Sequence, residues 1–264
     1  MVVTMEMVLF MVNKIHALSK PLISIIGVIG LWFYVSSHPN VSNFVLPTPQ
    51  HVWTTFTNMF GSNELTLAIL ISLKRVFIGF ICASILAFIS AFIFYLLPKL
   101  HGYCSFLIEF LRNIPPLALI PLLILWLGIG EETKIVLIIL AAYFPIFLNI
   151  EKGFQSCDKD LIEVGQSMKF SSFEIFYKIV LPSSLKDILV GMRVGLGLSW
   201  RSIIAAEMIA ASSGLGYMIL FAQQMSRTDR VIIGIIIIGL IGFLCDYLFK
   251  LLIRYLVKTE VDYV

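Results

Sequence analysis

One stretch of this chain differs from the sequence on both sides of it: residues 151–187, which read EKGFQSCDKDLIEVGQSMKFSSFEIFYKIVLPSSLKD. It holds five lysines and six acidic residues. Both flanking segments are long and apolar, so we expect the stretch to emerge into water between two membrane-spanning segments. A membrane protein with a polar loop of this length is expected to dock a soluble partner there.

The composition predicts a membrane protein. Of 264 residues, 59% are hydrophobic and 13% are charged, whereas soluble globular chains carry about 25% charged residues. The net charge of +3 and the lack of basic runs interleaved with aromatic residues argue against a nucleic-acid partner. The four cysteines and four histidines are widely scattered, which disfavours a disulfide framework or a metal site.

Continuous apolar runs predict an all-α membrane protein with about six transmembrane helices, because an open sheet would leave unpaired backbone groups in lipid. We expect the third run to be kinked or broken by Pro115, Pro116 and Pro121. A single membrane domain is predicted over 1–264, with its core at 65–256 and the polar loop at about 151–187. The six runs are 21–37, 72–97, 104–128, 133–150, 188–211 and 231–256.

The distribution of lysine and arginine predicts that both termini are cytoplasmic. Lys74 and Arg75 fall near the outer membrane edge in this topology, and we expect them to snorkel to the interface. The N-terminus has several methionines and does not resemble a cleaved signal peptide, so the first run is expected to remain as a helix. The inside residues are Lys14, Lys20, Lys99, Lys152, Lys159, Lys169, Lys178, Lys186, Lys250, Arg254 and Lys258; the outside ones are Lys74, Arg75, Lys134, Arg227 and Arg230.

The segment 38–64 contains no lysine or arginine, as is typical of an exported loop. Within it, LPTPQHVW (46–53) predicts a short interfacial helix that begins near the prolines and places Trp53 at headgroup level.

Charged residues inside the fifth run predict a functional surface. Arg201 and Glu207 are six residues apart, about 240° around a helix, so they do not share one face. Unpaired intramembrane charges cost several kcal/mol. Our hypothesis is that Arg201 faces a translocation cavity and attracts an anionic substrate, while Glu207 braces the helix or gates the exit. An internal ion-pair or packing role for each is the alternative.

Small residues and prolines allow two interpretations each. Gly191, Gly195 and Gly197 predict close helix packing, or else a subunit interface. The prolines at 115, 116 and 121 predict a bent pore helix, or else a simple kink. We expect GIGEE (128–132) to form an exposed outer turn and SSGLG (212–216) to end the fifth helix.

The polar loop contains a motif. From Glu163 the sequence reads EVGQSMK, and ten residues after Lys169 it reads IVLP (179–182). This resembles the cytoplasmic loop of bacterial ABC-importer permeases, in which Glu-Ala-Ala, three residues, Gly and nine residues precede Ile-x-Leu-Pro. The residues that match are Glu163, Gly165, Ile179, Leu181 and Pro182; Val164 replaces an Ala, and Lys169 stands where the family has the Gly that takes φ > 0 at little cost.

The resemblance covers roughly residues 45–255 and is closest to permeases for nitrate, sulfonate, taurine and bicarbonate. It is carried by RNIPPLALIPLLILWLGIGEETK (112–134), GLSWRSIIAAEMIAASSGLGYMI (197–219), LPTPQHVW and SLKRVFIGF (72–80).

This resemblance implies a type I ABC-importer permease fold in the bacterial inner membrane. It implies a homodimer in which each copy rests on one ATPase subunit through the loop, while a substrate-binding protein docks outside. No cofactor is expected on this chain, because ATP and Mg²⁺ belong to the ATPase and the sequence has no G-x-x-x-x-G-K-[ST] cradle. The residues implied for coupling are Glu163, Gly165, Lys169, Ile179, Leu181 and Pro182; those predicted for the substrate pathway are Arg201, Glu207, Pro115 and Pro116.

Catalysis of bond cleavage is not expected, because the dispersed histidines support no Ser/His/Asp set. Two alternatives stay open at this point. One is a permease of the same class for a thiamin or riboflavin precursor. The other is an ion-driven secondary transporter, which needs no ATPase and no docking loop.

Overall fold

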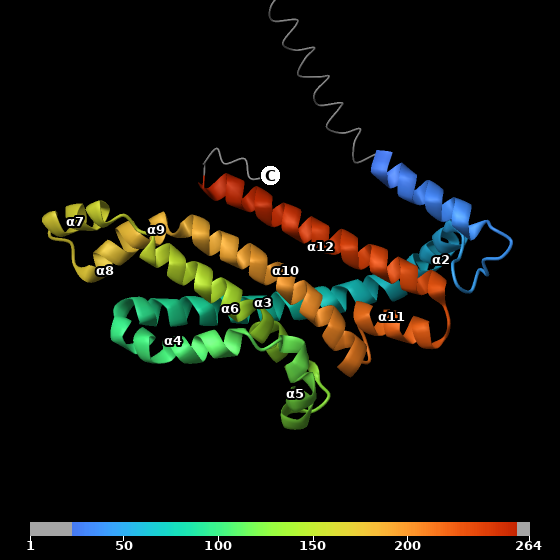
Figure 1. Ribbon diagram of the computed structural model, residues 1–264, viewed down its shortest axis with the longest axis horizontal. Helices are drawn as coiled ribbons and strands as arrows, with labels where there is room; N and C mark the ends of the chain where they lie inside the picture. The colour runs from blue at the N-terminus through green and yellow to red at the C-terminus, as the bar shows by residue number, and fades with distance from the viewer. Residues whose placement is uncertain (1–22, 258–264) are drawn as a thin grey trace, which may run out of the picture. The chain divides into compact units, whose positions relative to one another are not determined.

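A computed structural model describes residues 23–257, and within this range it contains helices and no strand, as predicted (Figure 1). The described chain divides into two compact units. One comprises residues 23–63 with Phe221–Ile233, and the other comprises Glu64–Leu220 with the chain from Gly234 onward. Lys14, Lys20 and Lys258, on which the predicted orientation partly rests, lie outside the described residues.

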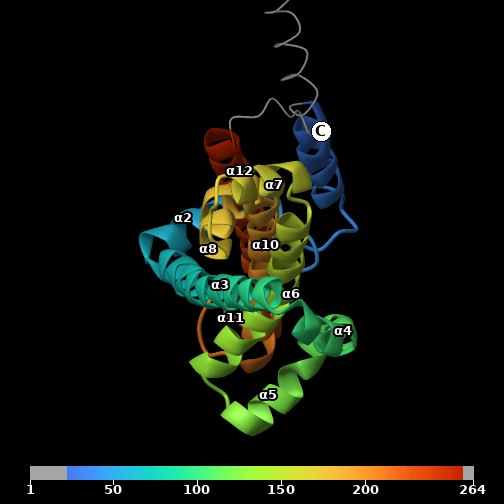
Figure 2. The same ribbon diagram turned by 90° about the vertical axis from the view of Figure 1, so that its left-hand side faces the viewer.

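The core of the larger unit is a layer of three long helices: α3 (Glu64–Leu96), α6 (Glu131–Gln155) and α10 (Leu185–Ala210). α6 packs against both α10 and α3. Figures 1 and 2 show α6 and α10 running alongside each other, with α3 crossing them at an angle. Two glycines allow α10 to approach α6. A Cβ added at Gly191 would lie 2.5 Å from Asn149, and a Cβ added at Gly195 would lie 2.5 Å from Ile146, so a side chain at either position would collide with α6. Helix packing therefore accounts for these two glycines.

Four helices of the described chain are long and apolar enough to cross a membrane: α3, α6, α10 and α12 (Thr228–Val257). A fifth span is possible if α4 (Pro98–Arg112) and the segment Pro116–Leu127 act together. The first predicted run, 21–37, contains the shorter apolar helix Ile23–Ser36. The all-α fold is thus confirmed, with four to five spans by length and composition among residues 23–257.

The third predicted run is broken by its prolines. The axes of α4 and Pro116–Leu127 differ by 85°. Pro115 is extended and precedes the 3₁₀ turn η1 (Pro116–Leu119), and Pro121 lies in the first turn of α5 (Ile120–Leu127). Each proline occupies a position where a missing N–H costs little, so the chain can turn here without unsatisfied donors.

The smaller unit is held by polar contacts around the helix α2 (Pro49–Gly61). The predicted start at the prolines is confirmed, because the Thr48 side chain caps α2 and Pro49 is its first residue. The indole nitrogen of Trp32 donates to the carbonyl of Pro47 (3.1 Å). Trp53 is 65% exposed, and its place at headgroup level stays a prediction.

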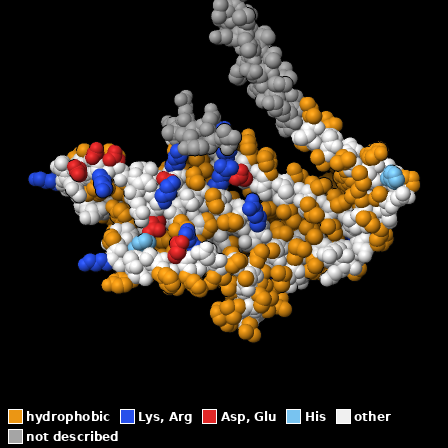
Figure 3. Space-filling model, in the orientation of Figure 1, with side chains coloured by type: hydrophobic (Ala, Val, Ile, Leu, Met, Phe, Trp, Pro, Cys, Tyr) orange, Lys and Arg blue, Asp and Glu red, His pale blue; other side chains and the backbone are white. Residues whose placement is uncertain are grey.

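The connection that holds the polar motif comprises α7 (Lys159–Ser167), α8 (Ser172–Ile175), the π-helical turn η2 (Phe176–Val180) and α9 (Leu181–Ser183). It lies at one end of α6 and α10 within the larger unit (Figure 1). Figure 3 shows charged side chains gathered over α7 and α8, whereas hydrophobic side chains cover the surface around α5. We call residues 159–183 the polar finger. The remaining helix, α11 (Leu215–Gln224), lies between α10 and α12 in the chain.

Candidate functional site

The polar finger begins and turns through well-formed caps. The Asp158 side chain accepts a hydrogen bond from the N–H of Asp160 (3.0 Å) and starts α7. At its other end Lys169 takes φ of +59°. The Lys169 N–H donates to Gln166 (2.9 Å) and the Phe170 N–H to Gly165 (3.1 Å), which is the double-bonded Schellman end of a helix. Lysine therefore occupies the turn position of the family's glycine, at a cost of roughly 1–2 kcal/mol.

Gly165 allows the two halves of the motif to pack closely against each other. It is buried, and a Cβ at this position would lie 2.6 Å from Cδ1 of Ile179. The missing side chain lets α7 rest on η2. Pro182 follows directly, and because it has no N–H, a regular α-turn cannot continue through it. The backbone widens into the π-turn just before this proline.

A capping box fixes the second helix of the finger. The Ser171 hydroxyl accepts from the N–H of Glu174, and the Glu174 carboxylate accepts from the N–H of Ser171 (3.0 Å). The Ser171 N–H and the Lys178 ammonium, at 3.0 Å from the carboxylate, lower the pKa of Glu174 to about 2. The carboxylate is therefore ionised at neutral pH and keeps the box closed.

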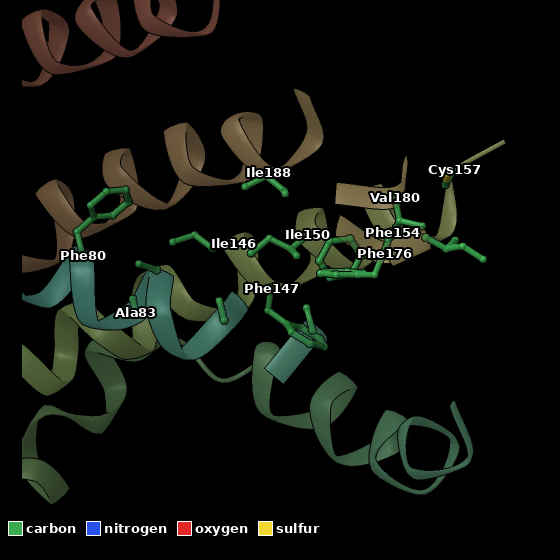
Figure 4. Close-up of a cluster of buried hydrophobic side chains, with 14 residues drawn as sticks. Phe80, Ala83, Ile146, Phe147, Ile150, Phe154, Cys157, Phe176, Val180 and Ile188 are labelled. Carbon is green, nitrogen blue, oxygen red and sulfur yellow. The ribbon is translucent and has the colours of Figure 1, made fainter. Parts of the chain in front are cut away.

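Aromatic packing anchors the finger in the helical core. Phe176 of η2 is 5% exposed. Its ring centroid lies 4.7 Å from that of Phe92, 5.1 Å from Tyr95 and 5.2 Å from Phe154. Figure 4 shows Phe154, Phe176 and Val180 together at the end of the buried cluster. Because interiors pack as densely as organic crystals, a displacement of η2 must move α3 and α6 with it.

The outer surface of the finger combines apolar and acidic groups. Glu163 is exposed, and its carboxylate forms no hydrogen bond or ion pair with any residue between 23 and 257. Five apolar side chains of the finger are between 48% and 69% exposed. Three of them, two on α7 and one at its C-cap, share one face at spacings of three and four residues, a face that Glu163 does not share. We call all five the apolar stripe: Leu161, Val164, Met168, Phe173 and Tyr177.

The predicted coupling residues thus fall into two groups. Gly165 and half-buried Ile179 and Leu181 form the interior of the finger, whereas Glu163, Lys169 and Pro182 are exposed. The motif located the finger. It did not identify the apolar stripe, whose members could have been found from their helical spacing.

A cavity of about 780 Å³ lies between the α4–η1 break, α6 and α10. Its lining includes three of the residues predicted for a substrate pathway, namely Arg201, Pro115 and Pro116. Arg112 also lines it, which the sequence did not suggest. The other lining residues are Asn113, Ile114, Leu117, Leu140, Ala141, Phe144, Pro145, Leu148, Leu198 and Ser202.

Arg201 is a cation without a partner in the described structure. It is exposed and forms no hydrogen bond or ion pair with residues 23–257. A second cavity, of about 140 Å³, lies on another side of Arg201 and is lined by Asp246. Both oxygens of Asp246 accept hydrogen bonds of 2.6 Å from Arg193, so this carboxylate is already engaged. The positive charge of Arg201 is therefore available to a ligand.

Glu207, the other predicted pathway residue, lies in a buried ion cluster and does not line the large cavity. Its side chain is 0% exposed. It accepts hydrogen bonds from the Ser72 hydroxyl (2.8 Å), from Arg75 (2.7 Å) and from the N–H of Gly216 (2.9 Å). The internal ion pair of our alternative interpretation is present, whereas a gating role stays a prediction.

The position of Arg75 corrects a prediction. We expected this side chain to snorkel to the interface, but it is 4% exposed. Its guanidinium donates two hydrogen bonds to Glu131 (2.6 and 2.7 Å), in addition to the bond to Glu207, and one to the carbonyl of Ser213 (2.8 Å). Lys134 also pairs with Glu131 (2.8 Å). Burial is tolerated because every charge is paired.

The cluster fixes the break after α10. The predicted end of this helix is confirmed, since α10 ends at Ala210 and α11 begins at Leu215. Gly214 has φ of +107°, and a Cβ there would lie 2.3 Å from the Glu207 carboxyl. The N–H of Leu215 donates to the Ser72 hydroxyl (2.9 Å). Thus α3, α6, α10 and the 211–214 turn are joined through two oppositely charged side chains, Arg75 and Glu207.

Comparison with known proteins places the chain in a family. Residues 76–258 match the model of the binding-protein-dependent transport system inner membrane component. The chain belongs to this family of ABC transporter permeases.

Relatives include permeases named for aliphatic sulfonates, taurine and nitrate. The chain is 36% identical to the aliphatic sulfonates transport permease protein SsuC of Bacillus subtilis, over 89% of this chain and 86% of that one. It is 34% identical to the taurine transport system permease protein TauC of Escherichia coli, over 82% and 80%. It is 30% identical to the nitrate import permease protein NrtB of Synechocystis, over 91% and 90%.

Solved structures share the fold. The inward-facing MetNI methionine ABC transporter matches with a TM-score of 0.57 at 20% identity, over 70% of this chain and 94% of that chain. An amino acid ABC transporter crystallised with histidines matches with a TM-score of 0.61 at 17% identity, over 77% and 96%. The fold is that of the type I ABC-importer permeases.

Proposed function

We propose that this chain forms the translocation pathway of an ATP-driven importer for a small organic or inorganic anion, and that it is driven by a separate ATPase through the polar finger. Two copies form a homodimer in the cytoplasmic membrane, with both termini and the finger in the cytoplasm. Each copy rests on one of two ATPase subunits. An extracytoplasmic binding protein delivers the substrate, and the whole chain, 1–264, acts as one permease domain.

The observation that carries this proposal is the construction of the finger. An apolar stripe and an unpartnered Glu163 face outward, while Phe176 is locked into the core. Exposed apolar side chains rimmed by polar ones are typical of a protein-binding surface. A surface of this kind on a rigid, core-anchored element supports a mechanical connection to a partner.

The mechanism follows from this rigidity. When the ATPase pair closes on ATP, the two fingers are drawn together, and the motion passes through η2 to α3 and α6. The cavity then opens outward and receives the substrate from the binding protein. ATP hydrolysis and separation of the ATPases return the cavity to its inward-facing state.

The anionic substrate is supported by Arg201 and by the names of the relatives. An uncompensated arginine in an apolar helix costs several kcal/mol unless water or a ligand meets it. Sulfonates, taurine and nitrate, which occur in the names of the relatives, all carry negatively charged oxygens. Pro115 and Pro116 shape the cavity wall opposite the helix that bears Arg201.

Co-purification with the partner ABC ATPase tests the proposal. Glu163→Arg and Val164→Asp place unfavourable charge on the docking surface, so we expect loss of stable assembly or of substrate-stimulated ATP hydrolysis. Glu132→Arg is a matched control, because it reverses an exposed charge at the opposite end of α6. An importer that assembles and hydrolyses ATP normally with both finger variants would contradict the proposal.

A further inference from the structure

The large cavity has an unusual charge composition. Its described lining contains two arginines, Arg112 and Arg201, and no aspartate, glutamate or lysine. Ser202 contributes a hydroxyl, and most of the remaining wall is apolar, including Phe144 and Leu198. A site with two guanidinium groups and an apolar wall suits a ligand that has an anionic head and a short apolar tail.

The two arginines reach the cavity from different elements. Arg112 is in the last turn of α4, and Arg201 is in the middle of α10. Arg112 forms an ion pair with Glu109, an exposed carboxylate that does not itself line the cavity, and its other donors have no partner among residues 23–257. Each planar guanidinium can donate two parallel hydrogen bonds to the oxygens of an oxyanion.

We propose that this cavity is an organosulfonate subsite, in which Arg112 and Arg201 bind the sulfonate oxygens and the wall formed by Phe144 and Leu198 accepts the alkyl chain. This inference rests on the proposed function and adds a specificity step within the permease itself. Nitrate is expected to bind less tightly, because it has no alkyl chain that could cover the apolar wall and displace water from it.

The lack of a carboxylate in the described lining gives the subsite a second preference. Taurine and 1-propanesulfonate have nearly the same shape and differ in that taurine carries an ammonium group where propanesulfonate has a methyl group. Burying an ammonium group without a partner is unfavourable, and the unpaired Arg201 adds like-charge repulsion. The subsite therefore selects an uncharged alkyl tail over a zwitterion.

Direct binding to the assembled permease–ATPase complex, without binding protein, tests the inference. Titration calorimetry with 1-propanesulfonate, taurine and nitrate is expected to give tightest binding for propanesulfonate, by about tenfold or more over taurine. Arg201→Met and Arg112→Gln should each weaken propanesulfonate binding by about tenfold or more. Arg254→Gln, which removes an exposed arginine outside the cavity, should not change it.

An added carboxylate provides a test that does not depend on losing an arginine. Ser202→Asp should weaken propanesulfonate and narrow or invert its advantage over taurine. The inference is overturned if the parent complex binds no propanesulfonate, if taurine binds equally well, or if the arginine and Ser202 variants bind as the parent does. Each of these results can occur in a complex that assembles and hydrolyses ATP normally, so the proposed function can survive the failure of the subsite.

Discussion

Two charged side chains on α10 lie six residues apart in opposite environments. Glu207 is fully buried and is held by Ser72, Arg75 and a backbone N–H. Arg201 is exposed in a cavity and has no partner among residues 23–257. The difference separates two uses of a charged residue within an apolar helix. A charge that is paired by other parts of the chain holds helices together, whereas a charge without a partner is available to a ligand.

The largest loss of stability is expected from Arg75→Leu, which removes the cation that is paired with the buried Glu207. The substitution leaves the Glu207 carboxylate buried with its main cation removed, which typically costs about 3–5 kcal/mol. We expect a large drop in the melting temperature of the detergent-solubilised protein. Lys74→Leu is the matched control, because Lys74 is the exposed neighbour.

A second substitution sharpens the same test. Arg75→Leu combined with Glu207→Leu removes both charges, so the double variant should be more stable than Arg75→Leu alone. Additive losses would mean that the two side chains act independently, against the geometry described above.

An intermediate effect is expected at the turn that the cluster fixes. Gly214→Ala introduces a Cβ at φ of +107°, where it would lie 2.3 Å from the Glu207 carboxyl. Strain of this kind costs roughly 1–3 kcal/mol. Gly197→Ala, at a helical glycine with open space around it, is the control and should melt at or slightly above the temperature of the parent, because alanine is the better helix former. Equal melting temperatures for both variants would show that the turn does not depend on Glu207.

The smallest effect on stability is expected from Arg201→Met. This substitution removes a charge that has no partner to lose, so stability should stay within about 0.5 kcal/mol of the parent or rise. A loss as large as that of Arg75→Leu would show that Arg201 is a structural residue, and the contrast between the two sites would disappear.

Much of the fold could be predicted because it depends on local sequence. The apolar runs located α3, α6, α10 and α12, and the prolines at 115 and 116 located the break after α4. The helix bounds were less accurate: α3 begins at Glu64, eight residues before its predicted start, although the intervening residues 64–71 are themselves mostly apolar.

The functional residues also differ in whether local sequence is enough to identify them. The finger could be found from a motif of fixed spacing, and the turn at Lys169 is preserved although glycine is absent. The partners of Arg75 could not be found, since they lie 56 and 132 residues further along the chain. Arg112 was missed for the same reason: it lines one cavity with Arg201, which lies 89 residues further along the chain (201 − 112).

Uptake into vesicles tests most directly whether the finger connects an ATPase to the membrane helices. The permease and its ATPase are reconstituted with binding protein and labelled propanesulfonate, and uptake is compared with and without ATP on the finger side. We predict uptake that requires ATP and the ATPase and that Val164→Asp abolishes, while Glu132→Arg transports normally. Uptake by the permease alone, or ATP-dependent uptake that is unchanged by Val164→Asp, would contradict this account.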